Sequence, residues 1–264
     1  MGRGRAVDDK LLMPDIALAL EQVGVSFGGL KAVDQITIAV NRGERRAVIG
    51  PNGAGKTTLF NAITGLHPPT SGRILFDGRD VTRMRPHRRA HRGMSRTFQI
   101  TNLFQSLTVV QNMQLALRGL RARRFSMLGS SGLTSEEAAR IDAALRASRL
   151  TDRLNASVGE LSYGEQRQLE LAMALVPRPK LLLLDEPAAG LSPSERGVVI
   201  EIIGSLSREF TVMLIEHDMD LVLNLVDWVT CLNNGKMLVE GAPADIRTNQ
   251  EVQDVYLGKA RRHA

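Results

Sequence analysis

A glycine-rich loop between an apolar strand and a helix constrains this chain more than any other feature. The letters GPNGAGKTT follow the apolar run RRAVIG and lead into TTLFNAITGL, in which apolar residues recur at helical spacing. They match the pattern G-x-x-x-x-G-K-[ST], whose glycines let successive backbone N–H groups point inward at phosphate oxygens. The helix that follows directs its positive N-terminus at the same anions. The loop therefore predicts a site for the phosphates of a nucleotide.

The side chains of this loop have distinct expected roles at ATP. Lys56 adds positive charge at the β- and γ-phosphates, and the hydroxyl of Thr57 is a ligand for Mg²⁺. The predicted ATP-binding residues of the loop are Gly50, Pro51, Asn52, Gly53, Ala54, Gly55, Lys56, Thr57 and Thr58.

A second motif, LLLLDE, places two acids behind a continuous apolar strand. Asp185 at the strand end is predicted to hold Mg²⁺, and Glu186 is predicted to orient or deprotonate a water that attacks the γ-phosphate. An acidic pair behind a strand is also a common helix cap. In a chain that carries a phosphate loop, the catalytic interpretation is the more specific one, and the two motifs together indicate a P-loop NTPase.

The pattern of elements favours an α/β fold. Apolar strands alternate with helices, which predicts a RecA-like P-loop core with a parallel sheet. Before the loop, residues 14–48 read as short strands of an antiparallel β subdomain, and an α-helical subdomain is inserted in the middle of the chain. The predicted division is 14–98 and 177–245 for the two parts of the ATP-binding core, 99–176 for the helical subdomain and 246–264 for the tail.

Further short motifs resemble those of the ABC ATPases. LSYGEQ, residues 161–166, is similar to the family's signature sequence, which is usually written LSGGQ. Gln99 in RTFQ matches its Q-loop, His217 in LIEHD its switch histidine, and Phe27 the aromatic residue that stacks on adenine. Together with the loop and the acidic pair, these motifs follow one another in the family's order from residue 27 to residue 217, which makes the resemblance specific.

The resemblance implies a role for each of these residues. Glu186, His217 and Gln99 would be catalytic, and Gln99 would also contact Mg²⁺ together with Thr57 and Asp185. Ser162, Gly164 and Glu165 would bind the γ-phosphate of ATP held by a second ATPase subunit, in a head-to-tail dimer. The physical basis is that Ser162 opens a helix, which leaves N–H groups free at its positive end.

Departures from the usual motifs point to one subfamily. Tyr163 replaces the first glycine of the signature, Glu165 replaces its glutamine, and Ser192 stands where the D-loop normally has aspartate. These changes resemble the ATPases of branched-chain amino-acid importers, as do the stretch RTFQITNLFQSLTVVQNMQLAL and the ending VYLGKA.

The function implied by the resemblance is ATP hydrolysis that energises amino-acid uptake through separate transmembrane permease subunits, supplied by a solute-binding protein. The second ATPase subunit is either a copy of this chain or a related one. Open alternatives are a urea or amide importer, a lipid or lipopolysaccharide exporter, a non-transport ABC ATPase, and a regulatory module that binds ATP without turnover. Glu186 and His217 weigh against the last of these.

The composition of the chain indicates the cellular compartment in which we expect it. The chain lacks a run of about 18 apolar residues, and its early apolar run is broken by Pro14 and Asp15, so we expect neither a membrane span nor a signal peptide. A single cysteine suits a reducing cytosol, and the expected place is peripheral, at the cytoplasmic face of the inner membrane. Much of the net charge of +6 comes from arginine clusters at 83–96 and 118–124. We interpret them as a solvated face, with contact to lipid headgroups near a membrane partner as the alternative. Because few aromatic residues lie between the arginines, no nucleic-acid partner is expected.

An apolar segment after Gln99 suggests where a permease docks. The apolar side chains are Ile100, Leu103, Phe104, Leu107, Val109 and Val110. In ABC transporters, a groove beside the Q-loop receives a short coupling helix, and this segment resembles theirs. We expect part of this set on the surface as anchors for that helix.

Overall fold

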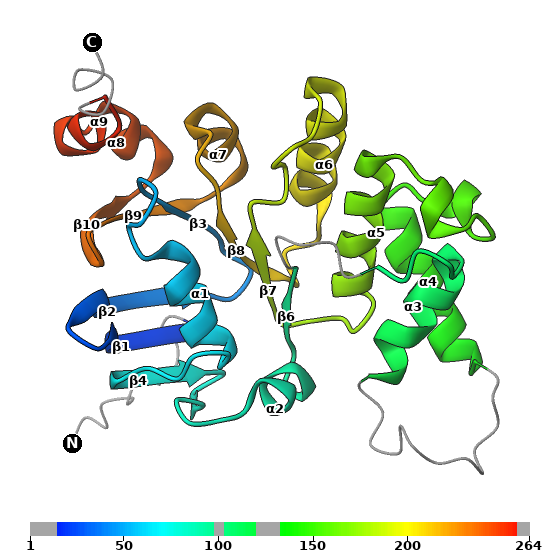
Figure 1. Cartoon of the computed structure of the whole chain (residues 1–264), viewed down its shortest axis with the longest axis horizontal. Helices are drawn as coiled ribbons and strands as arrows, with labels where there is room; N and C mark the ends of the chain where they lie inside the picture. Colours follow the sequence, from blue (N-terminus) through cyan, green and yellow to red (C-terminus); the bar gives the residue numbers. More distant parts are fainter. Residues whose placement is uncertain (1–14, 98–102, 120–132, 258–264) are drawn as a thin grey trace, which may run out of the picture.

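The computed structural model describes residues 15–97, 103–119 and 133–257. Figure 1 shows two sheets side by side and a lobe of helices beyond the larger sheet. This arrangement confirms the predicted α/β fold with an antiparallel β region and a group of helices inserted in the chain. Gln99 and Ile100 lie outside the described residues.

The smaller sheet is antiparallel and has the order β2-β1-β4-β5. Its strands are β1 (Ile16–Phe27), β2 (Leu30–Asn41), β4 (Ser71–Phe76) and β5 (Arg79–Asp80). The tight turn between β1 and β2 falls at Gly28 and Gly29.

The larger sheet has the order β10-β9-β3-β8-β7-β6 and carries the phosphate loop. Its strands are β3 (Arg45–Ile49), β6 (Met94–Arg96), β7 (Leu181–Asp185), β8 (Thr211–Ile215), β9 (Trp228–Asn233) and β10 (Lys236–Gly241). Neighbouring strands are parallel except β10, which forms a hairpin with β9 through Asn234 and Gly235. The carboxyl ends of β3, β7 and β8 therefore meet at one edge, where ligands bind in open α/β sheets.

Both faces of the large sheet are buried, which explains its continuous apolar strands. Successive side chains of a strand point to opposite faces. Leu181 and Leu183 of β7 join a core with the antiparallel sheet and α1 (Lys56–Thr64), while Leu182 and Leu184 join the core of the helical lobe. One strand thus fixes the phosphate-loop helix on one side and the lobe on the other.

The helices of the lobe begin at capped residues. Thr134 and Glu137 form a capping box at the start of α4, and Ser162 and Glu165 form one at the start of α5. The lobe contains α3 (Val109–Arg118), α4 (Ser135–Ala147) and α5 (Tyr163–Leu175), with short 3₁₀ turns at Thr151–Arg153 and Val158–Glu160. The remaining helices are α2 (Pro86–His91), α6 (Pro193–Ser205), α7 (Met219–Leu225), α8 (Pro243–Thr248) and α9 (Gln250–Leu257).

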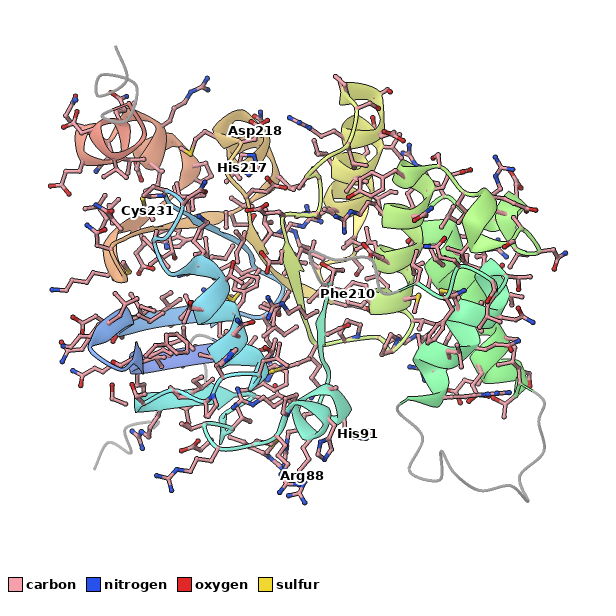
Figure 2. All side chains as sticks on the ribbon, viewed as in Figure 1. Arg88, His91, Phe210, His217, Asp218 and Cys231 are labelled. Carbon is pink, nitrogen blue, oxygen red and sulfur yellow. The ribbon has the colours of Figure 1, made fainter. Side chains whose placement is uncertain are left out.

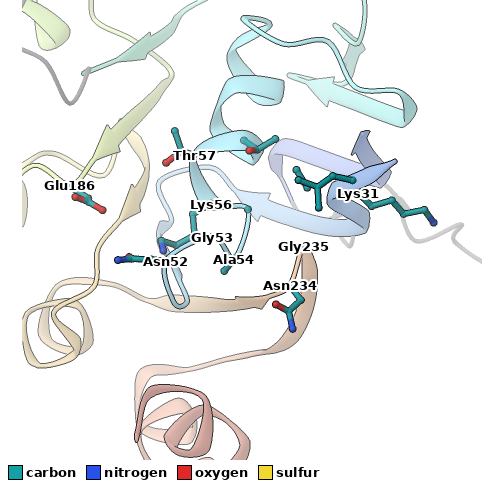
Figure 3. Close-up of a pocket in the computed structure, with 13 residues that line it drawn as sticks. Lys31, Asn52, Gly53, Ala54, Lys56, Thr57, Glu186, Asn234 and Gly235 are labelled. Carbon is teal, nitrogen blue, oxygen red and sulfur yellow. The ribbon is translucent and has the colours of Figure 1, made fainter. Parts of the chain in front are cut away.

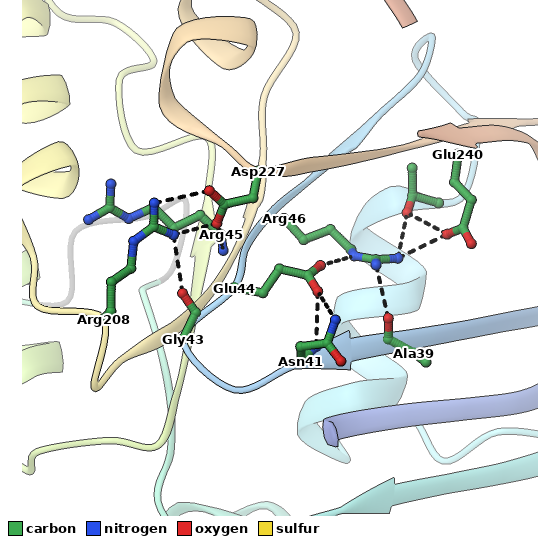
Figure 4. Close-up of polar contacts among 10 residues, drawn as sticks. Ala39, Asn41, Gly43, Glu44, Arg45, Arg46, Arg208, Asp227 and Glu240 are labelled. Atoms are coloured by element: carbon green, nitrogen blue, oxygen red, sulfur yellow. Dashed lines mark hydrogen bonds and ion pairs between the residues drawn. The ribbon is translucent and has the colours of Figure 1, made fainter. Parts of the chain in front are cut away.

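A buried arginine ties the two sheets together. Arg46 of β3 donates to the Ala39 carbonyl of β2 at 2.9 Å, to Glu240 of β10 at 2.9 Å and to Glu44 at 2.6 Å (Figure 4). Its side chain is 4% exposed, so charge-assisted bonds satisfy a guanidinium that would otherwise be costly to bury. The network fixes the small sheet relative to the strand that leads into the phosphate loop.

The arginine cluster at 83–96 is only partly a solvated face. Arg83, Arg85, Arg88 and Arg92 are exposed on and around α2, and Figure 2 shows Arg88 and His91 at the outer edge of the molecule. Arg89 and Arg96 contradict the prediction, because the first is 1% exposed and the second forms a buried ion pair. Backbone carbonyls at the end of α1 bind Arg89, and its burial lowers the pKa of the guanidinium to about 10.

Candidate functional site

A cavity of about 480 Å³ lies over the phosphate loop (Figure 3). Its size is within the usual range for small-molecule sites. The residues that line it are Leu30, Lys31, Ala32, Asn52, Gly53, Ala54, Gly55, Lys56, Thr57, Thr58, Glu186, Asn234 and Gly235. The structure therefore brings together most of the predicted loop residues and Glu186, although these lie far apart in the sequence.

Two glycines are required by the backbone of this loop. Gly50 has φ 147° and Gly55 has φ 100°, both in a region that side chains disfavour. A Cβ atom on Gly50 would lie 2.2 Å from the Leu232 carbonyl oxygen, and one on Gly55 would lie 2.3 Å from that of Ala32. The close approach of neighbouring loops thus explains the fixed glycines of the motif.

Lys56 is buried at the start of α1 and points back into the loop. Its Nζ donates to the Gly50 carbonyl at 2.7 Å and to the Pro51 carbonyl at 3.1 Å. These bonds keep the ammonium beside the cavity, where its charge is available to phosphate oxygens.

Asp185 lies at the end of β7, almost fully buried. Its Oδ2 accepts from the Arg96 guanidinium at 2.7 Å, while its Oδ1 is buried without a hydrogen-bond partner among the described residues. Burial raises the pKa of the Asp185 carboxyl, against the opposing effect of Arg96. An unsatisfied buried carboxylate oxygen fits a Mg²⁺ site, since Mg²⁺ is commonly held by one or two carboxylates plus substrate phosphates. In the described part of the chain, no group of three or more His, Cys, Asp or Glu residues could hold a metal by itself.

Glu186 adopts a backbone conformation that is unusual for a residue with a side chain. Its φ is 48°, and its N–H donates to the Ile215 carbonyl of β8 at 3.0 Å. Such left-handed positions cost energy and cluster at functional sites. Here the turn directs the carboxylate into the cavity over the phosphate loop.

His217 follows β8 and is exposed, beside a buried acid that the sequence analysis did not single out. His217 Nδ1 lies 3.9 Å from Glu216 Oε2, and Figure 2 shows His217 between the sheet and α7. Glu216 is 2% exposed, accepts from the N–H groups of Ala188 and His217, and has a pKa that burial raises. Glu216 therefore joins the loop after Glu186 to the predicted switch histidine.

The signature residues lie away from the cavity over the phosphate loop. Ser162, Gly164 and Glu165 open α5 in the helical lobe, and none of them lines the cavity over the phosphate loop. The signature residues therefore lie apart from the phosphate loop of their own chain.

The prediction of free N–H groups at this helix end is wrong for the chain alone. Gly164 N–H donates to Glu195 Oε1 at 3.0 Å, and Glu165 N–H donates to Ser162 Oγ at 3.2 Å. Glu195 also caps α6 with Ser192, whose hydrogen bonds lower the pKa of Glu195. One carboxylate therefore joins the starts of α5 and α6, and a phosphate that binds Gly164 must displace it.

Tyr163 stands at the first turn of α5 with ordinary backbone angles, so a glycine is not required there. Its hydroxyl accepts from Arg167 at 2.8 Å, and its ring lies against Gly190 in the loop before α6. We expect Tyr163→Gly to keep ATPase activity within about tenfold of the parent, a barrier change of about 1.4 kcal/mol. Steady-state phosphate release measures this, with Tyr163→Phe as the control that keeps the ring. A complete loss with glycine would show a specific role for the ring.

Phe27 is 50% exposed at the end of β1, and its ring packs edge-on against His67 with centroids 5.8 Å apart. It does not line the cavity, although Leu30 across the same turn does. We expect Phe27→Ala to weaken ATP affinity by about 1–3 kcal/mol, the value for a base stacked on an aromatic ring. Equilibrium titration with ATP and with GTP tests this, since stacking affects both nucleotides alike. An unchanged dissociation constant would exclude stacking.

A second, mostly apolar groove of about 330 Å³ lies between the large sheet and the helical lobe. Its residues are Thr64, Leu66, Pro86, Arg89, Ala90, Gly93, Met94, Ser95, Arg96, Ala116, Gly119, Pro177 and Pro179. None of the docking residues predicted from the sequence lines this groove, as far as the structure describes them. Of those, Phe104 is 56% exposed and Val109 is buried, while Leu103, Leu107 and Val110 are partly buried.

Comparison with known proteins decides the family. The family model described as "ABC transporter" matches residues 33–189, and the model "Branched-chain amino acid ATP-binding cassette transporter" matches residues 236–261. This chain belongs to the ATP-binding proteins of ABC transporters. The predicted relationship to the branched-chain amino-acid subfamily is thereby confirmed, on the second match and on the relatives described next.

Curated relatives of this ABC protein cover nearly its whole length. It is 41% identical over 250 residues to the high-affinity branched-chain amino acid transport ATP-binding protein BraF of Pseudomonas aeruginosa. The aligned residues cover 92% of this chain and 98% of the relative. It is 38% identical to LivG of Escherichia coli, with the same coverage. These relatives favour an importer ATPase over the exporter and non-transport alternatives.

Solved structures agree with the fold. An ATP-binding cassette of an ABC transporter in its ADP conformation superposes with a TM-score of 0.81 at 30% identity, covering 92% of this chain and 99% of that one. A nucleotide-free cassette gives a TM-score of 0.79 at 29% identity and covers 91% of this chain and 98% of that one. No helix within the described ranges of the present ABC protein combines the length and the apolar character needed to cross a membrane.

Proposed function

We propose that this protein hydrolyses ATP and uses the cycle to drive uptake of branched-chain amino acids. The observation that carries the proposal is the meeting of the phosphate loop, Glu186 and the buried Asp185 at one edge of the sheet, while the signature helix faces elsewhere. The names of its relatives supply the cargo class. A urea or amide importer is the second candidate, because this subunit does not contact the cargo.

In the proposed mechanism, loop N–H groups and Lys56 hold the β- and γ-phosphates. Asp185 and Thr57, with Gln99, would hold Mg²⁺, which neutralises charge on the phosphate oxygens when it is bound. Glu186 orients the attacking water and takes its proton, and His217 contacts the γ-phosphate. Ser162, Gly164 and Glu165 complete the site of a second ATPase subunit, with Glu195 released from Gly164 as the dimer closes.

We further propose that the ATPase works at the cytoplasmic face of the inner membrane, beneath transmembrane permease subunits that a solute-binding protein supplies. The helical subdomain at 99–176 would sit between the core segments 14–98 and 177–245, with 246–264 as the tail. Two separate features support docking of the permease at the helical lobe. One is the apolar groove between the large sheet and the lobe, and the other is the exposed ring of Phe104, which lies outside the lining of that groove.

Uptake by a host strain that lacks the gene tests the proposed function. We expect loss of radiolabelled leucine, isoleucine and valine uptake, restored by the parent gene and not by Lys56→Ala, which removes charge from the phosphate cradle. Labelled urea serves as the competing cargo. Normal leucine uptake in the deletion strain, combined with loss of urea uptake, would replace the amino-acid assignment with the second candidate.

A further inference from the structure

We propose that Arg96 is a positioning residue that holds the Asp185 carboxylate in the orientation in which it binds the metal. The sequence alone predicts for Arg96 only a place in the solvated arginine cluster at 83–96. The inference rests on the proposed function in one respect, namely that Asp185 is a ligand of Mg²⁺.

The ion pair itself is short and buried. Arg96 Nη2 donates to Asp185 Oδ2 at 2.7 Å, and the two side chains are 7% and 1% exposed. Charge-assisted bonds of this kind fix geometry strongly when water is excluded. Because the bond engages Oδ2, the second oxygen, Oδ1, keeps its capacity to accept and has no partner among the described residues. Arg96 thus presents one defined oxygen for a cation.

The guanidinium is held from a second side by the phosphate-loop helix. Arg96 Nη1 donates to Asn61 Oδ1 at 2.6 Å and lies 3.5 Å from Thr64 Oγ1, both on α1. Its Cζ also lies 5.9 Å from the centre of the Phe60 ring, within cation–π range. A planar guanidinium can serve the carboxylate and α1 at once, whereas an ammonium has no such fork. The orientation of Asp185 is therefore tied to the helix that carries Lys56 and Thr57.

The same residue forms part of the apolar groove. Arg96 and Thr64 both line it, and β6, which ends at Arg96, lies against β7, which ends at Asp185. The N–H of Thr97 donates to the Leu183 carbonyl at 3.0 Å, which fixes the end of β6 to β7 just before the segment that contains Gln99. Arg96 therefore both lines the groove and holds the carboxylate.

Metal binding by the full-length protein tests the proposal. Mn²⁺, which replaces Mg²⁺ and is detected by electron paramagnetic resonance, is titrated into protein saturated with ATP, and ATP affinity is measured separately in EDTA. We expect Arg96→Met to weaken Mn²⁺ affinity by about 10–100-fold, the usual effect of losing a residue that orients a metal ligand. ATP affinity in EDTA should stay at the parent value. Arg96→Lys should give an intermediate loss, because one ammonium cannot hold both Asp185 and Asn61 in the arginine geometry.

Arg89→Lys is the matched control. Arg89 is buried and lines the same groove, but its guanidinium donates to backbone carbonyls of Thr82, Met84, Ala62 and Ile63. We expect Arg89→Lys to lower the temperature of thermal unfolding, because these bonds are weakened, and to leave Mn²⁺ affinity at the parent value.

Asp185→Asn separates the metal role of Asp185 from the positioning role of Arg96. Unchanged Mn²⁺ affinity in this variant would refute the proposed metal role of Asp185, and the inference with it. If Asp185→Asn binds Mn²⁺ weakly while Arg96→Met and Arg96→Lys bind it as the parent does, the metal role stands and the positioning role of Arg96 is overturned. Should Arg96→Met fail to fold, Arg96→Lys alone decides in the same way, since it keeps the charge beside the buried carboxylate.

Discussion

Glu186→Gln is expected to abolish ATP turnover while leaving ATP binding intact. Glutamine keeps the shape of the side chain that enters the cavity over the phosphate loop but removes the carboxylate that would orient and deprotonate water. Loss of a general base lowers rates by about 10²–10⁴-fold. The left-handed backbone at Glu186 is equally open to either residue, so the turn itself should persist.

Two measurements separate chemistry from binding in this variant. Phosphate release gives the turnover rate, and equilibrium titration with ATP gives the affinity. Light scattering after size-exclusion chromatography should show a trapped ATP-bound dimer, because ATP that is not hydrolysed keeps the two subunits closed. Glu209→Gln, at an exposed glutamate after α6, is the matched control and should behave as the parent. Hydrolysis at the parent rate by Glu186→Gln would remove Glu186 from the catalytic role.

Local signals explain why much of the fold was predictable from the sequence. The apolar run at 181–184 reads as a strand buried on both faces, and alternate leucines of β7 do enter two different cores. Thr134 and Glu137 mark a helix start because the capping box is made by residues three apart. The phosphate loop is equally local, since its glycines and Lys56 act through backbone bonds within the loop.

Contacts between distant elements were not predictable in this way. Arg96 lies in an arginine-rich stretch, and only the pairing of β6 with β7 places it against Asp185. Glu195 lies 31 residues after Gly164, and the meeting of α5 with α6 makes it the acceptor for Gly164 N–H. Charge and spacing along a chain identify exposed clusters, whereas burial and partners depend on tertiary packing.

Ser192 stands where the D-loop usually has aspartate, and its contacts at the start of α6 explain why serine suits this position. Ser192 is the N-cap of α6: it accepts from the Glu195 N–H at 3.4 Å, and its own hydroxyl donates to that carboxylate at 2.7 Å. Serine and aspartate are both strong N-cap residues. The serine therefore caps the start of α6 in the way that an aspartate at this position could also do.

Phe104→Asp is expected to uncouple transport while the isolated subunit still folds and binds ATP. The backbone of Phe104 is clamped by buried Asn112, whose Oδ1 accepts from the Phe104 N–H at 3.0 Å and whose Nδ2 donates to the Phe104 carbonyl at 3.2 Å. These bonds do not involve the ring, which is 56% exposed. A substitution at such a position should change the free energy of unfolding by no more than about 0.5 kcal/mol.

The effect on a permease should be much larger, because a few buried apolar anchors supply most of the affinity of a helix docked in a groove. Loss of one such anchor costs about 2 kcal/mol or more, and an aspartate adds the cost of burying a charge. We expect leucine uptake to fall by more than about tenfold, or the subunit to leave the membrane fraction. Met237→Asp changes another exposed apolar residue, 38% exposed on β10 and far from α3, and should leave uptake intact. Normal uptake and membrane association with Phe104→Asp would place the docking face elsewhere, and an unfolded variant would return Phe104 to the core.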